Sequence, residues 1–596
     1  MIIFNLIMNK LDQVTIKNNK LEKYYSLKGN FWSERDYDKN IFNSLKSKFS
    51  NEYILLQLLV SRGIASQKID DFINPKLKNL LPDPYTVDDM KRASDKICDF
   101  IKRKKKIGVF GDYDVDGSSS TALVCNYLKS IGASFEYYIP DRMSEGYGPN
   151  KKAFDILKEK KCELILTLDC GTSSNDAISY ANAKGIEIII VDHHLEGDKL
   201  PDAFAIVNPN KKADKSTLNN LCAAGVVFFL IISINRSLKE DNFFADSNPP
   251  NLLKFLDLVA LGTICDLVKL DLVNRALVKQ GMRVMNKLLN SGIKSLVNCS
   301  SIKDEISEYH LGFVLGPRIN AAGRVGDSRL GATLLINDRN ELNLSIAERL
   351  NYYNQLRKKV EKKVELQAHN QVNANGEEII CVHSKDWHPG VIGIVAGKLT
   401  ENFKRPSIVI SENKDVCKAS CRSVKNFHMG DFIIKAVRDG FLISGGGHEM
   451  AGGFSILAEK IEVFKDYTKN KFSLSDIHHE KSYDMEINLS SVNLDLYKSI
   501  AKLQPYGMGN PKPKFLLRNC IKNFVKSAAE IHLIAYLNDI YGNSVKSIAF
   551  NSQQTEIGRL LNDDDKKELD IICTLQLNRW NGYENVELII EDILEK

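Results

Sequence analysis

The feature that most constrains this chain is a set of acidic residues that each follow an apolar, strand-like run. They are Asp112, Asp114 and Asp116 in V-F-G-D-Y-D-V-D-G, Asp169 in L-I-L-T-L-D-C-G, Asp192 in E-I-I-I-V-D-H-H, and Asp266 in L-G-T-I-C-D-L. In a parallel α/β sheet the carboxyl ends of the strands share one edge, so these side chains are expected to converge on one crevice. Asp and His side chains gathered there are the ligands of hard divalent cations. The pattern therefore predicts a metal-dependent enzyme.

Length and composition narrow the class of protein. The 596 residues exceed what one hydrophobic core can organise and, at about 150 residues per domain, predict three or four domains. An apolar content of 43% and a charged content of 26% are ordinary for a soluble globular protein. The net charge of +6 is small for this length, so any nucleic-acid surface must come from local patches.

Cysteine usage and hydropathy set the expected compartment. The twelve cysteines stand singly, without C-x-x-C spacing, which argues against structural zinc and against a disulfide framework. The apolar start M-I-I-F-N-L-I-M lacks the parts of a signal peptide, and no run approaches the ~18 apolar residues of a membrane span. We expect a cytoplasmic protein without a membrane segment.

Alternating strand and helix patterns predict the fold after the first hundred residues. Strands are expected at Ile107–Gly111, Phe135–Ile139, Leu164–Leu168 and Ile186–Val191, with helices over Ser118–Ile131 and Asp176–Lys184. This alternation favours a parallel sheet with helices on both faces. The unbroken apolar runs Ala223–Ile234 and Leu252–Ile264 are too long for strands and are expected to be buried helices.

The second half of the chain contains a connector, a second lobe and a barrel. Glu341–Val372 is highly charged and has neither Gly nor Pro, which predicts one long helix between two lobes. A second α/β lobe is expected from Glu377 to Phe472, with a glycine cluster at Gly445–Phe454. After the polar boundary Ser473–Lys481, short apolar strands alternate with turns, which predicts a small β-barrel.

The spacing of the first acids favours metal binding over helix capping. Asp114 and Asp116 are two residues apart, so in extended backbone their carboxylates point the same way. One acid here would fit a helix N-cap, but three acids in five residues exceed that need and repel one another without a cation. Asp169 and Asp266, each taken alone, fit a cap as well as a ligand.

The adjacent histidines after Asp192 extend the same interpretation. Two neighbouring side chains diverge, so His193 and His194 cannot both fill a core. One can bind metal through a ring nitrogen while Asp192 fixes its tautomer. The other can face the substrate and protonate a leaving oxygen or hold a phosphate.

Three further patterns have both a functional and a structural interpretation. The Lys102–Lys106 run is a candidate phosphate contact, but such runs are more often solvated helix ends. The glycines at Gly445–Gly447 either let backbone N–H groups approach a phosphate or form a tight turn. Aromatic and basic residues interleave in the last domain, as in single-strand binders, although most of the rings are expected in the barrel core. These residues are Tyr506, Phe515, Tyr536, Phe550, Trp580 and Tyr583, with Lys512, Lys514, Lys522, Lys546 and Arg579.

The order D-Y-D-V-D-G, L-D-C-G, D-H-H and G-T-I-C-D resembles the four motifs of the DHH phosphoesterase superfamily. The segments L-G-P-R-I-N-A-A-G-R, W-H-P-G-V-I-G-I-V-A-G-K-L, G-G-G-H-E-M-A-G-G-F and L-Q-P-Y-G-M-G-N-P-K-P-K-F are similar to those of the bacterial RecJ family of single-stranded-DNA exonucleases. The resemblance runs from about Leu56 to the C-terminus. It implies an α/β fold class: a parallel-sheet DHH lobe, a long helix, a smaller α/β DHH-associated lobe and a C-terminal OB-like β-barrel.

The resemblance gives the expected domains their names. They are a poorly ordered extension (1–30), an N-terminal helical subdomain (31–105), the DHH lobe (106–338), the connector helix (339–375), the DHH-associated substrate-binding lobe (376–472) and the OB-like nucleic-acid-binding domain (482–596).

The resemblance also implies roles for individual residues. The implied ligands of two Mn²⁺ or Mg²⁺ ions are Asp114, Asp116, Asp169, His193 and Asp266, with Asp169 as bridge. Relatives with smaller substrates carry a His at Phe110, so Asp112 or water is expected to complete one ion site. His194 and Asp169 are the implied catalytic residues, and Asp192 is the implied support of the metal-binding histidine, behind the ligands. The implied substrate-binding residues are Arg318, Asn320, Arg324, Ser420, Arg422, Gly446, Gly447 and His448. For Arg318 and Arg324, a salt bridge within the lobe stays an alternative to contact with the strand or a 5′ phosphate.

The implied function is 5′ to 3′ hydrolysis of single-stranded DNA to mononucleotides in DNA repair and recombination. The implied partners are single-stranded DNA, a single-strand-binding protein and a helicase, and the expected state is a monomer. Two rival functions stay open. One is a phosphoesterase for short oligonucleotides or small phosphorylated nucleotides, which would not need the flanking domains. The other is a binding protein that has lost catalysis, which would show broken ligand positions.

Overall fold

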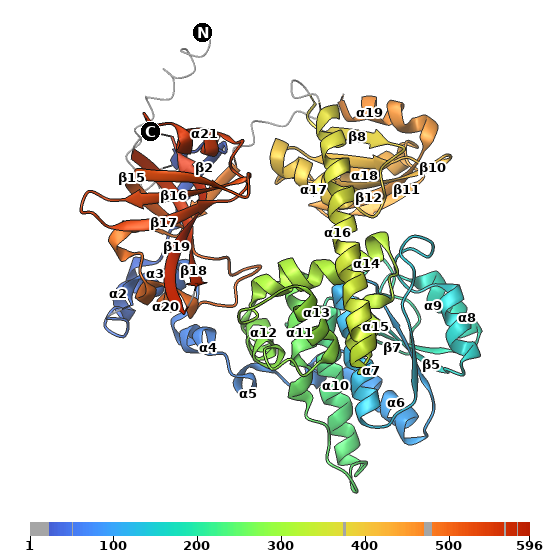
Figure 1. Ribbon diagram of the computed structural model, residues 1–596. Coiled ribbons are helices and arrows are strands. Elements are labelled where there is room, and N and C mark those ends of the chain that lie inside the picture. Colours follow the sequence, from blue (N-terminus) through green and yellow to red (C-terminus); the bar gives the residue numbers. More distant parts are fainter. Residues whose placement is uncertain are drawn as a thin grey trace. The chain divides into compact units, whose positions relative to one another are not determined.

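The computed structural model describes residues 23–50, 52–372, 377–469, 479–565, 568–580 and 582–595. The described chain forms two compact units (Figure 1). The larger contains the described parts of 75–475 together with 507–509, and the other contains those of 1–74, 476–506 and 510–596.

A five-stranded parallel sheet forms the centre of the larger unit's first lobe. The strands are β3 (Ile107–Gly111), β4 (Phe135–Tyr138), β5 (Leu164–Leu168), β6 (Glu187–Val191) and β7 (Ala205–Val207). Their order is β4-β3-β5-β6-β7, and each neighbouring pair is parallel. Every residue of β3 and β5 is buried, as expected for strands covered on both faces. The predicted parallel sheet is confirmed.

Helices cover both faces of this sheet. The helices of this lobe are α6 (Met90–Lys102), α7 (Val115–Ser130), α8 (Lys151–Glu159), α9 (Asn175–Ala183), α10 (Ala223–Glu240), α11 (Leu256–Cys265), α12 (Leu272–Met285), α13 (Ser291–Cys299), α14 (Gly316–Val325) and α15 (Leu330–Ile336). One core joins α6, α7, α10 and α11 to one face, and a second core joins α8 and α9 to the other. Two glycines bring α7 close to β3. A Cβ at Gly111 would lie 1.8 Å from Thr121 Oγ1, and one at Gly117 would lie 2.5 Å from the Asp112 carbonyl oxygen.

The long helix α16 (Asn340–Gln371) leads to the second lobe (Figure 1). Val364 and Ala368 of α16 pack in that lobe's core, which confirms the predicted connector. The lobe has the sheet order β11-β12-β10-β9-β8. Its elements are β8 (Ile380–Ser384), α17 (Ile392–Phe403), β9 (Ser407–Ser411), β10 (Val416–Arg422), α18 (Met429–Arg438), β11 (Ser444–Gly447), β12 (Ala451–Leu457) and α19 (Ile461–Lys469).

The other unit contains the predicted β-barrel. Its strands are β14 (Met485–Glu486), β15 (Phe515–Ala528), β16 (His532–Asn538), β17 (Ser544–Ala549), β18 (Glu568–Trp580) and β19 (Tyr583–Leu594), with helices α20 (Leu494–Ala501) and α21 (Glu556–Asn562). The order β14-β15-β16-β17-β19-β18 is closed by pairing of β15 with β18. Because the barrel is closed, its strands β15 to β19 have no free edge.

The N-terminal region differs from the sequence expectation. Residues 1–22 of the expected extension lie outside the described residues, but 23–30 are ordered: β1 (Lys23–Tyr25) pairs with β2 (Asn30–Glu34). β2 also pairs with β13 (His479–Tyr483), at the end of the expected polar boundary. A partner this far along the chain leaves no local pattern, which explains why the sequence did not reveal these strands.

The expected single helical subdomain 31–105 is divided between the two units. The helices α2 (Lys39–Leu45), α3 (Tyr53–Ser61) and α4 (Ile69–Ile73) belong with the barrel, whereas α5 (Leu77–Leu80) and α6 belong with the DHH-type lobe. A buried ion pair holds α3 in place, because Arg62 Nη1 lies 3.4 Å from Asp484 Oδ1 and both side chains are 2% exposed.

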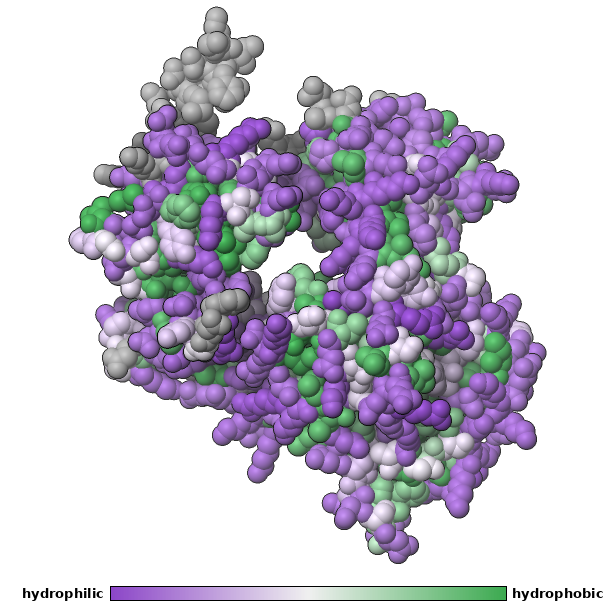
Figure 2. Space-filling model, viewed as in Figure 1, coloured by the Kyte–Doolittle hydropathy of each residue, from purple (hydrophilic) through white to green (hydrophobic). Residues whose placement is uncertain are grey.

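The surface and the cysteines agree with the composition. Hydrophilic residues cover most of the face seen in Figure 2, with apolar patches scattered among them. No helix within the described ranges is long and apolar enough to span a membrane. All twelve cysteines are free thiols.

Asp257 supplies a stability prediction for the first lobe. Its side chain is buried in the first turn of α11, where burial raises its pKa to about 7. Because this value lies above the usual one of about 3.9, the carboxylate weakens the fold as pH rises through 7. Asp257→Asn should increase the free energy of unfolding by on the order of 3 kcal/mol at pH 8 and change it little at pH 4. Unfolding midpoints at both pH values check this, and an equal effect at both would contradict it.

Candidate active site

The acidic and histidine side chains predicted from the motifs lie together. Ligand-type atoms fall within 4.8 Å of one another in three groups: Asp112 with Asp114 and Asp169, Asp169 with His193 and His194, and Asp116 with His193 and Asp266. Asp169 and His193 each belong to two groups. The groups therefore form one continuous cluster, named here the acidic cluster.

Strand ends and helix starts position most of this cluster. Asp112 follows β3, and Asp114 caps α7 by accepting the Gly117 N–H at 3.0 Å. Asp169 follows β5 with a left-handed φ of 62°, a conformation that strains a residue with a side chain. Asp266 lies at the C-cap of helix α11, which confirms the helix expected over Leu252–Ile264 and corrects the placement of Asp266 at a strand end.

Asp116 has a structural role as well as a place in the cluster. Its carboxylate oxygens accept the backbone N–H groups of Ala223 at 2.6 Å and Ala224 at 3.0 Å, at the start of α10. The same carboxylate lies 3.9 Å from His193 Nε2. Asp116 therefore connects the start of α10 to the cluster. It caps that helix and is at the same time a candidate metal ligand.

The electrostatics of the cluster fit a divalent cation. Burial and the neighbouring carboxylates raise the pKa of Asp112 and Asp169, and they raise that of Asp266 to about 8. Asp112 Oδ1, Asp169 Oδ1 and His193 Nε2 are buried without a hydrogen-bond partner. Throughout the described ranges, no Lys or Arg nitrogen forms an ion pair with these carboxylates. Carboxylates packed together without a lysine or arginine partner are a donor set that suits Mg²⁺ or Mn²⁺.

The two histidines have different environments. His193 Nε2 lies 3.3 Å from Asp169 and 3.6 Å from Asp266, and burial lowers its pKa, which favours the neutral, ligating form. His194 Nδ1 lies 2.7 Å from Asp192 Oδ1. Burial opposes its charge, but the hydrogen bond and charge of Asp192 raise the pKa of His194 to about 9. The Asp192 carboxylate thus supports the ring of His194, whereas from His193 it accepts the backbone N–H at 2.8 Å.

Sequence reasoning missed Tyr147 and two asparagines. The Tyr147 hydroxyl donates to the Asp169 carbonyl oxygen at 3.1 Å and lies 3.3 Å from His194 Nδ1. Asn208 donates to the His194 carbonyl at 2.8 Å, and Asn210 donates to that of His193. The signal was the glycine pair in E-G-Y-G-P-N, where both glycines have positive φ and shape a loop around the tyrosine.

A cluster of arginines lies where the two lobes meet. Arg324 donates to the Gly390 carbonyl at 3.1 Å, and burial with the charges of Arg142, Arg357 and Arg422 lowers its pKa to about 10. In the described chain, neither Arg142 nor Arg324 nor Arg422 forms a carboxylate ion pair. Guanidinium groups that depress one another's pKa predict an anion site.

The other predicted substrate residues of the first lobe fall in different places. Asn320 Oδ1 accepts the Val115 N–H at 3.1 Å and so holds the turn after Asp114. Arg318 points elsewhere: it donates to Asn351 Oδ1 at 3.1 Å and to the Val314 carbonyl at 2.7 Å. The structure therefore does not bring Arg318 into the arginine cluster. It lies six residues before Arg324 on α14, on another side of the helix.

The predicted residues of the second lobe share one sheet region. Ser420 pairs with Gly453, which pairs with Gly446, so the three lie in a row across β10, β12 and β11. A Cβ at Gly446 would meet nothing within 4 Å, so this face is open at the glycine. Arg422 lies on the same side as Ser420, two residues along β10. Gly447 and the exposed His448 begin the tight turn between β11 and β12, where His448 N donates to the Ala451 carbonyl at 2.8 Å.

Two other sequence features, Phe110 and the lysine run, are placed outside the acidic cluster. Phe110 packs in the core between Tyr138 and Phe154, with centroid distances of 6.1 and 6.5 Å, while Asp112 lies in the cluster. Lys102 and Lys105 pair with Asp241 and Glu163, which favours the solvated helix-end interpretation of the lysine run.

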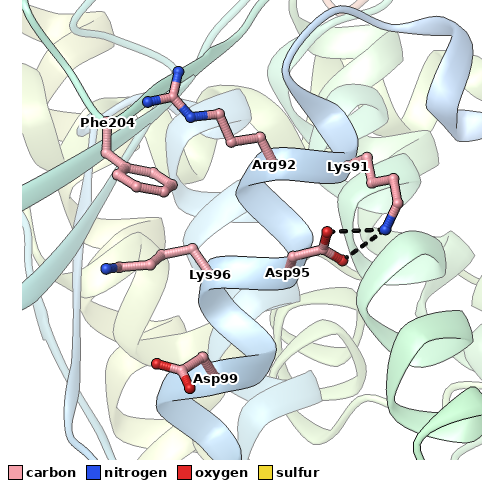
Figure 3. A pocket seen from close by; sticks show the side chains of 6 residues that line it. All are labelled: Lys91, Arg92, Asp95, Lys96, Asp99 and Phe204. Atoms are coloured by element: carbon pink, nitrogen blue, oxygen red, sulfur yellow. Dashed lines mark hydrogen bonds and ion pairs between the residues drawn. The ribbon is translucent and has the colours of Figure 1, made fainter.

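An open cavity of about 580 Å³ lies along α6 (Figure 3). Its lining residues are Lys91, Arg92, Asp95, Lys96, Asp99 and Phe204. Arg92 and Lys96 lie 4.6 and 4.8 Å from the centroid of the Phe204 ring. Lys91 pairs with Asp95 at 2.9 Å, and none of the predicted site residues lines the cavity.

The barrel aromatics are divided between core and surface. Phe515 is fully buried, whereas Phe550 and Tyr583 are exposed, and the Trp580 side chain lies outside the described ones. Lys514 and Lys546 pair with Glu591 and Glu587. The expectation that most of these rings fill the core is wrong, because Phe515 is the one buried ring of the five described and Tyr506 and Tyr536 are half-buried. Contact of one or two rings with DNA stays a prediction.

Comparisons with known proteins agree with this architecture. Family models match as the "DHH family, N-terminal domain" over residues 106–263, the "DHHA1 domain" over 376–473 and the "RecJ OB domain" over 483–592. The single-stranded-DNA-specific exonuclease RecJ of Salmonella typhimurium is 31% identical over 91% of this chain and 95% of its own length. Its Bacillus subtilis counterpart is 30% identical over 94% of this chain and 70% of its own length.

Solved structures show the same fold. The RecJ of Thermus thermophilus in complex with Mn²⁺ aligns with a TM-score of 0.77 at 24% identity, over 94% of this chain and 78% of that one. An exonuclease RecJ bound to manganese aligns with a TM-score of 0.56 at 28% identity, over 65% of this chain and 94% of that one. With all three domain models matched in order and relatives at 30–31% identity over most of their length, the chain belongs to the RecJ family of DHH proteins.

Proposed function

We propose that this chain is a metal-dependent exonuclease that hydrolyses single-stranded DNA from the 5′ end and releases mononucleotides. The observation that carries the proposal is the acidic cluster, in which buried carboxylates and a neutral histidine lie together without a lysine or arginine partner among the described residues. Its relatives are named single-stranded-DNA-specific exonucleases RecJ, which supports single-stranded DNA as the substrate. Intact ligand positions argue against a binding protein that has lost catalysis.

The acidic cluster would hold two Mn²⁺ or Mg²⁺ ions. Asp112, Asp114 and Asp169 would contact one ion, and Asp116, His193 and Asp266 the other, with Asp169 as the expected bridge. Bound ions of this kind neutralise phosphate charge and activate water for in-line attack. The manganese named with a 28%-identical RecJ structure supports this choice of metal.

The protein's own groups would position the substrate. The protonated His194, held by Asp192 at 2.7 Å, can bind the scissile phosphate or give its proton to the leaving oxygen. Tyr147 fixes the Asp169 main chain and the His194 ring together, since its hydroxyl reaches both. Asn320 holds the turn that carries Asp114.

The arginine cluster would set the polarity by binding a terminal 5′ phosphate. Arg422 and Ser420 lie against Gly393 in the first turn of α17, where a Cβ would lie 3.7 Å from Arg422 Nη2 and 2.9 Å from Ser420 Oγ. Helix N-termini and guanidinium groups both attract phosphate.

Arg422→Gln is expected to raise the KM for a 5′-phosphorylated strand about ten-fold or more, because a charge-assisted hydrogen bond contributes about 1.5–3 kcal/mol. The KM for a 5′-hydroxyl strand should change much less. Steady-state kinetics on the two strands measure this difference. Arg405→Gln is a matched control in the same lobe, since Arg405 donates to the Glu377 carbonyl. A KM that rises equally for both strands would contradict a 5′-phosphate role.

End-labelled digestion tests the proposed function. With Mg²⁺ or Mn²⁺, a 5′-labelled single strand should release labelled mononucleotide at once, whereas a 3′ label should appear only at the end of digestion. Blunt duplex should be cut far more slowly, because we expect the cleft between the two lobes to be too narrow for it. Label released first from the 3′ end, or equal turnover of duplex and single strand, would refute the proposal. Preference for very short oligonucleotides would favour the rival phosphoesterase.

The finer expectations about the cell belong to the same proposal. We expect the chain to act in the cytoplasm as a monomer, in DNA repair and recombination. The expected partners are a helicase, which would generate the single strand, and a single-strand-binding protein, which would present it.

A further inference from the structure

Two aromatic rings stand in solvent near the acidic cluster. Tyr309 is 60% exposed and Phe313 is 72% exposed. Their rings stack on each other with centroids 5.3 Å apart and an interplanar angle of 22°. Large apolar side chains gain free energy by burial, so an exposed stacked pair has no explanation in folding alone.

The backbone that carries these rings packs against the end of α11. It is a π-helical turn, His310–Leu315, a geometry frequent at functional sites. Leu311 and Leu315 are buried and anchor the turn, and Cys265 Sγ donates to the Leu311 carbonyl at 3.4 Å. A Cβ at Gly312 would lie 3.6 Å from Ile264 Cγ2. The rings are thus fixed to the helix turn that immediately precedes Asp266.

Leu267 adds a third exposed apolar side chain next to Asp266. It is 66% exposed and has a left-handed φ of 58°, which is unfavourable for leucine. Leu267, Tyr309 and Phe313 are named here the apolar rim. The rim adjoins the cluster residue Asp266 along the chain through Leu267, and in space through the π-helical turn.

We propose that the apolar rim is a nucleobase-binding site. Resting on the proposed function, it would stack the bases of the nucleotides next to the scissile phosphate while the acidic cluster engages that phosphate. Every base has an aromatic face, so stacking on Tyr309 and Phe313 would be independent of sequence. Because stacking requires unpaired bases, the rim would favour single strands over duplex. It would also favour polynucleotides over phosphorylated compounds that carry no base.

A role in base stacking can be separated from other roles of the apolar rim by changing both the protein side chains and the DNA strand. The variants are Tyr309→Leu/Phe313→Leu, which keeps apolar bulk without aromatic faces, and Phe313→Tyr, which keeps the ring. The substrates are a normal single strand and one whose 5′ nucleotides are abasic. The double-leucine variant should lose about ten-fold or more in kcat/KM on the normal strand and almost nothing on the abasic strand. Phe313→Tyr should behave as wild type on both strands.

A second readout does not need turnover. A strand with 2-aminopurine near its 5′ end, mixed with protein in EDTA, should show fluorescence quenched by wild type and not by the double-leucine variant. If wild type cleaves no single strand, the proposed function fails while this quenching still tests the rim. Absence of any difference between wild type and the double variant would overturn the inference. An equal loss on normal and abasic strands would overturn it too, and would assign the rim to protein contact or to folding. Unfolding midpoints check the fold of each variant.

Discussion

Replacing Asp169 by asparagine is expected to abolish DNA hydrolysis and, at the same time, to stabilise the metal-free protein. Asp169 is a ligand of one proposed ion and lies 3.3 Å from His193 Nε2 of the other, so the loss of this expected bridge should weaken both proposed metal positions. We expect a fall in kcat/KM on the order of 10³-fold or more. Burial and the charges of Asp116, Asp114 and Asp112 raise the pKa of Asp169, so its ionised form is unfavourable without a cation. Removing that charge should add about 2 kcal/mol to the free energy of unfolding at pH 8.

Asp257→Asn is the matched control for that experiment. It makes the same substitution at another buried aspartate with a raised pKa, at the other end of the helix that precedes Asp266. It should stabilise the fold at pH 8 and leave hydrolysis and the response to Mn²⁺ unchanged. If Asp169→Asn kept more than about a tenth of the activity, or lost stability in EDTA, the acidic cluster would not be the site of chemistry described above.

Replacing Asp592 by asparagine should release the first strands of the barrel unit. Asp592 is fully buried in β19, and its Oδ2 accepts hydrogen bonds from Ser26 Oγ at 2.7 Å, Trp32 Nε1 at 2.9 Å and Asn30 Nδ2 at 3.0 Å. The other oxygen, Oδ1, accepts the backbone N–H groups of Lys28 and Ile593. An amide has one acceptor oxygen, so its NH2 group would face one of these two sets of donors and leave them without a partner. The expected loss is about 3–5 kcal/mol in the free energy of unfolding of this unit.

Hydrogen exchange measures this effect locally. Amides of β1 and β2 should lose protection in Asp592→Asn before those of β15 and β18 do. Glu591→Gln is the neighbouring control, because Glu591 forms a half-exposed ion pair with Lys514 and should matter by less than about 1 kcal/mol. Unchanged protection of β1 and β2 would show that Asp592 does not hold them.

The parts of the fold that could be predicted are those that a short stretch of sequence determines by itself. β3 and β5 match their predicted bounds because each is a run of five buried residues between charged residues. The convergence of Asp114 and Asp169 followed from the shared edge of parallel strands. The connector α16 begins one residue before its predicted start, because a long charged segment without Gly or Pro has little alternative to a helix.

The parts that could not be predicted depend on distant partners. β2 pairs with β13 from a remote part of the chain, and Asp592 anchors it, so no local pattern reports either contact. Asp266 shares with the other acids the pattern of an acid after an apolar run, yet its run is the helix expected over Leu252–Ile264, which α11 confirms. The preference of Asp192 for His194 depends on side-chain directions after β6. Arg318 and Arg324 look equivalent in sequence, but they lie on different sides of α14 and therefore contact different residues.

The number of Mn²⁺ ions bound per chain tests the central claim most directly. Equilibrium dialysis or titration by electron paramagnetic resonance should give two ions for wild type and for Asp257→Asn. Asp169→Asn should bind fewer than two, with activity lost in parallel. A wild-type chain that binds no Mn²⁺, or an Asp169→Asn variant that binds two ions as tightly as wild type, would contradict a two-metal site in the acidic cluster.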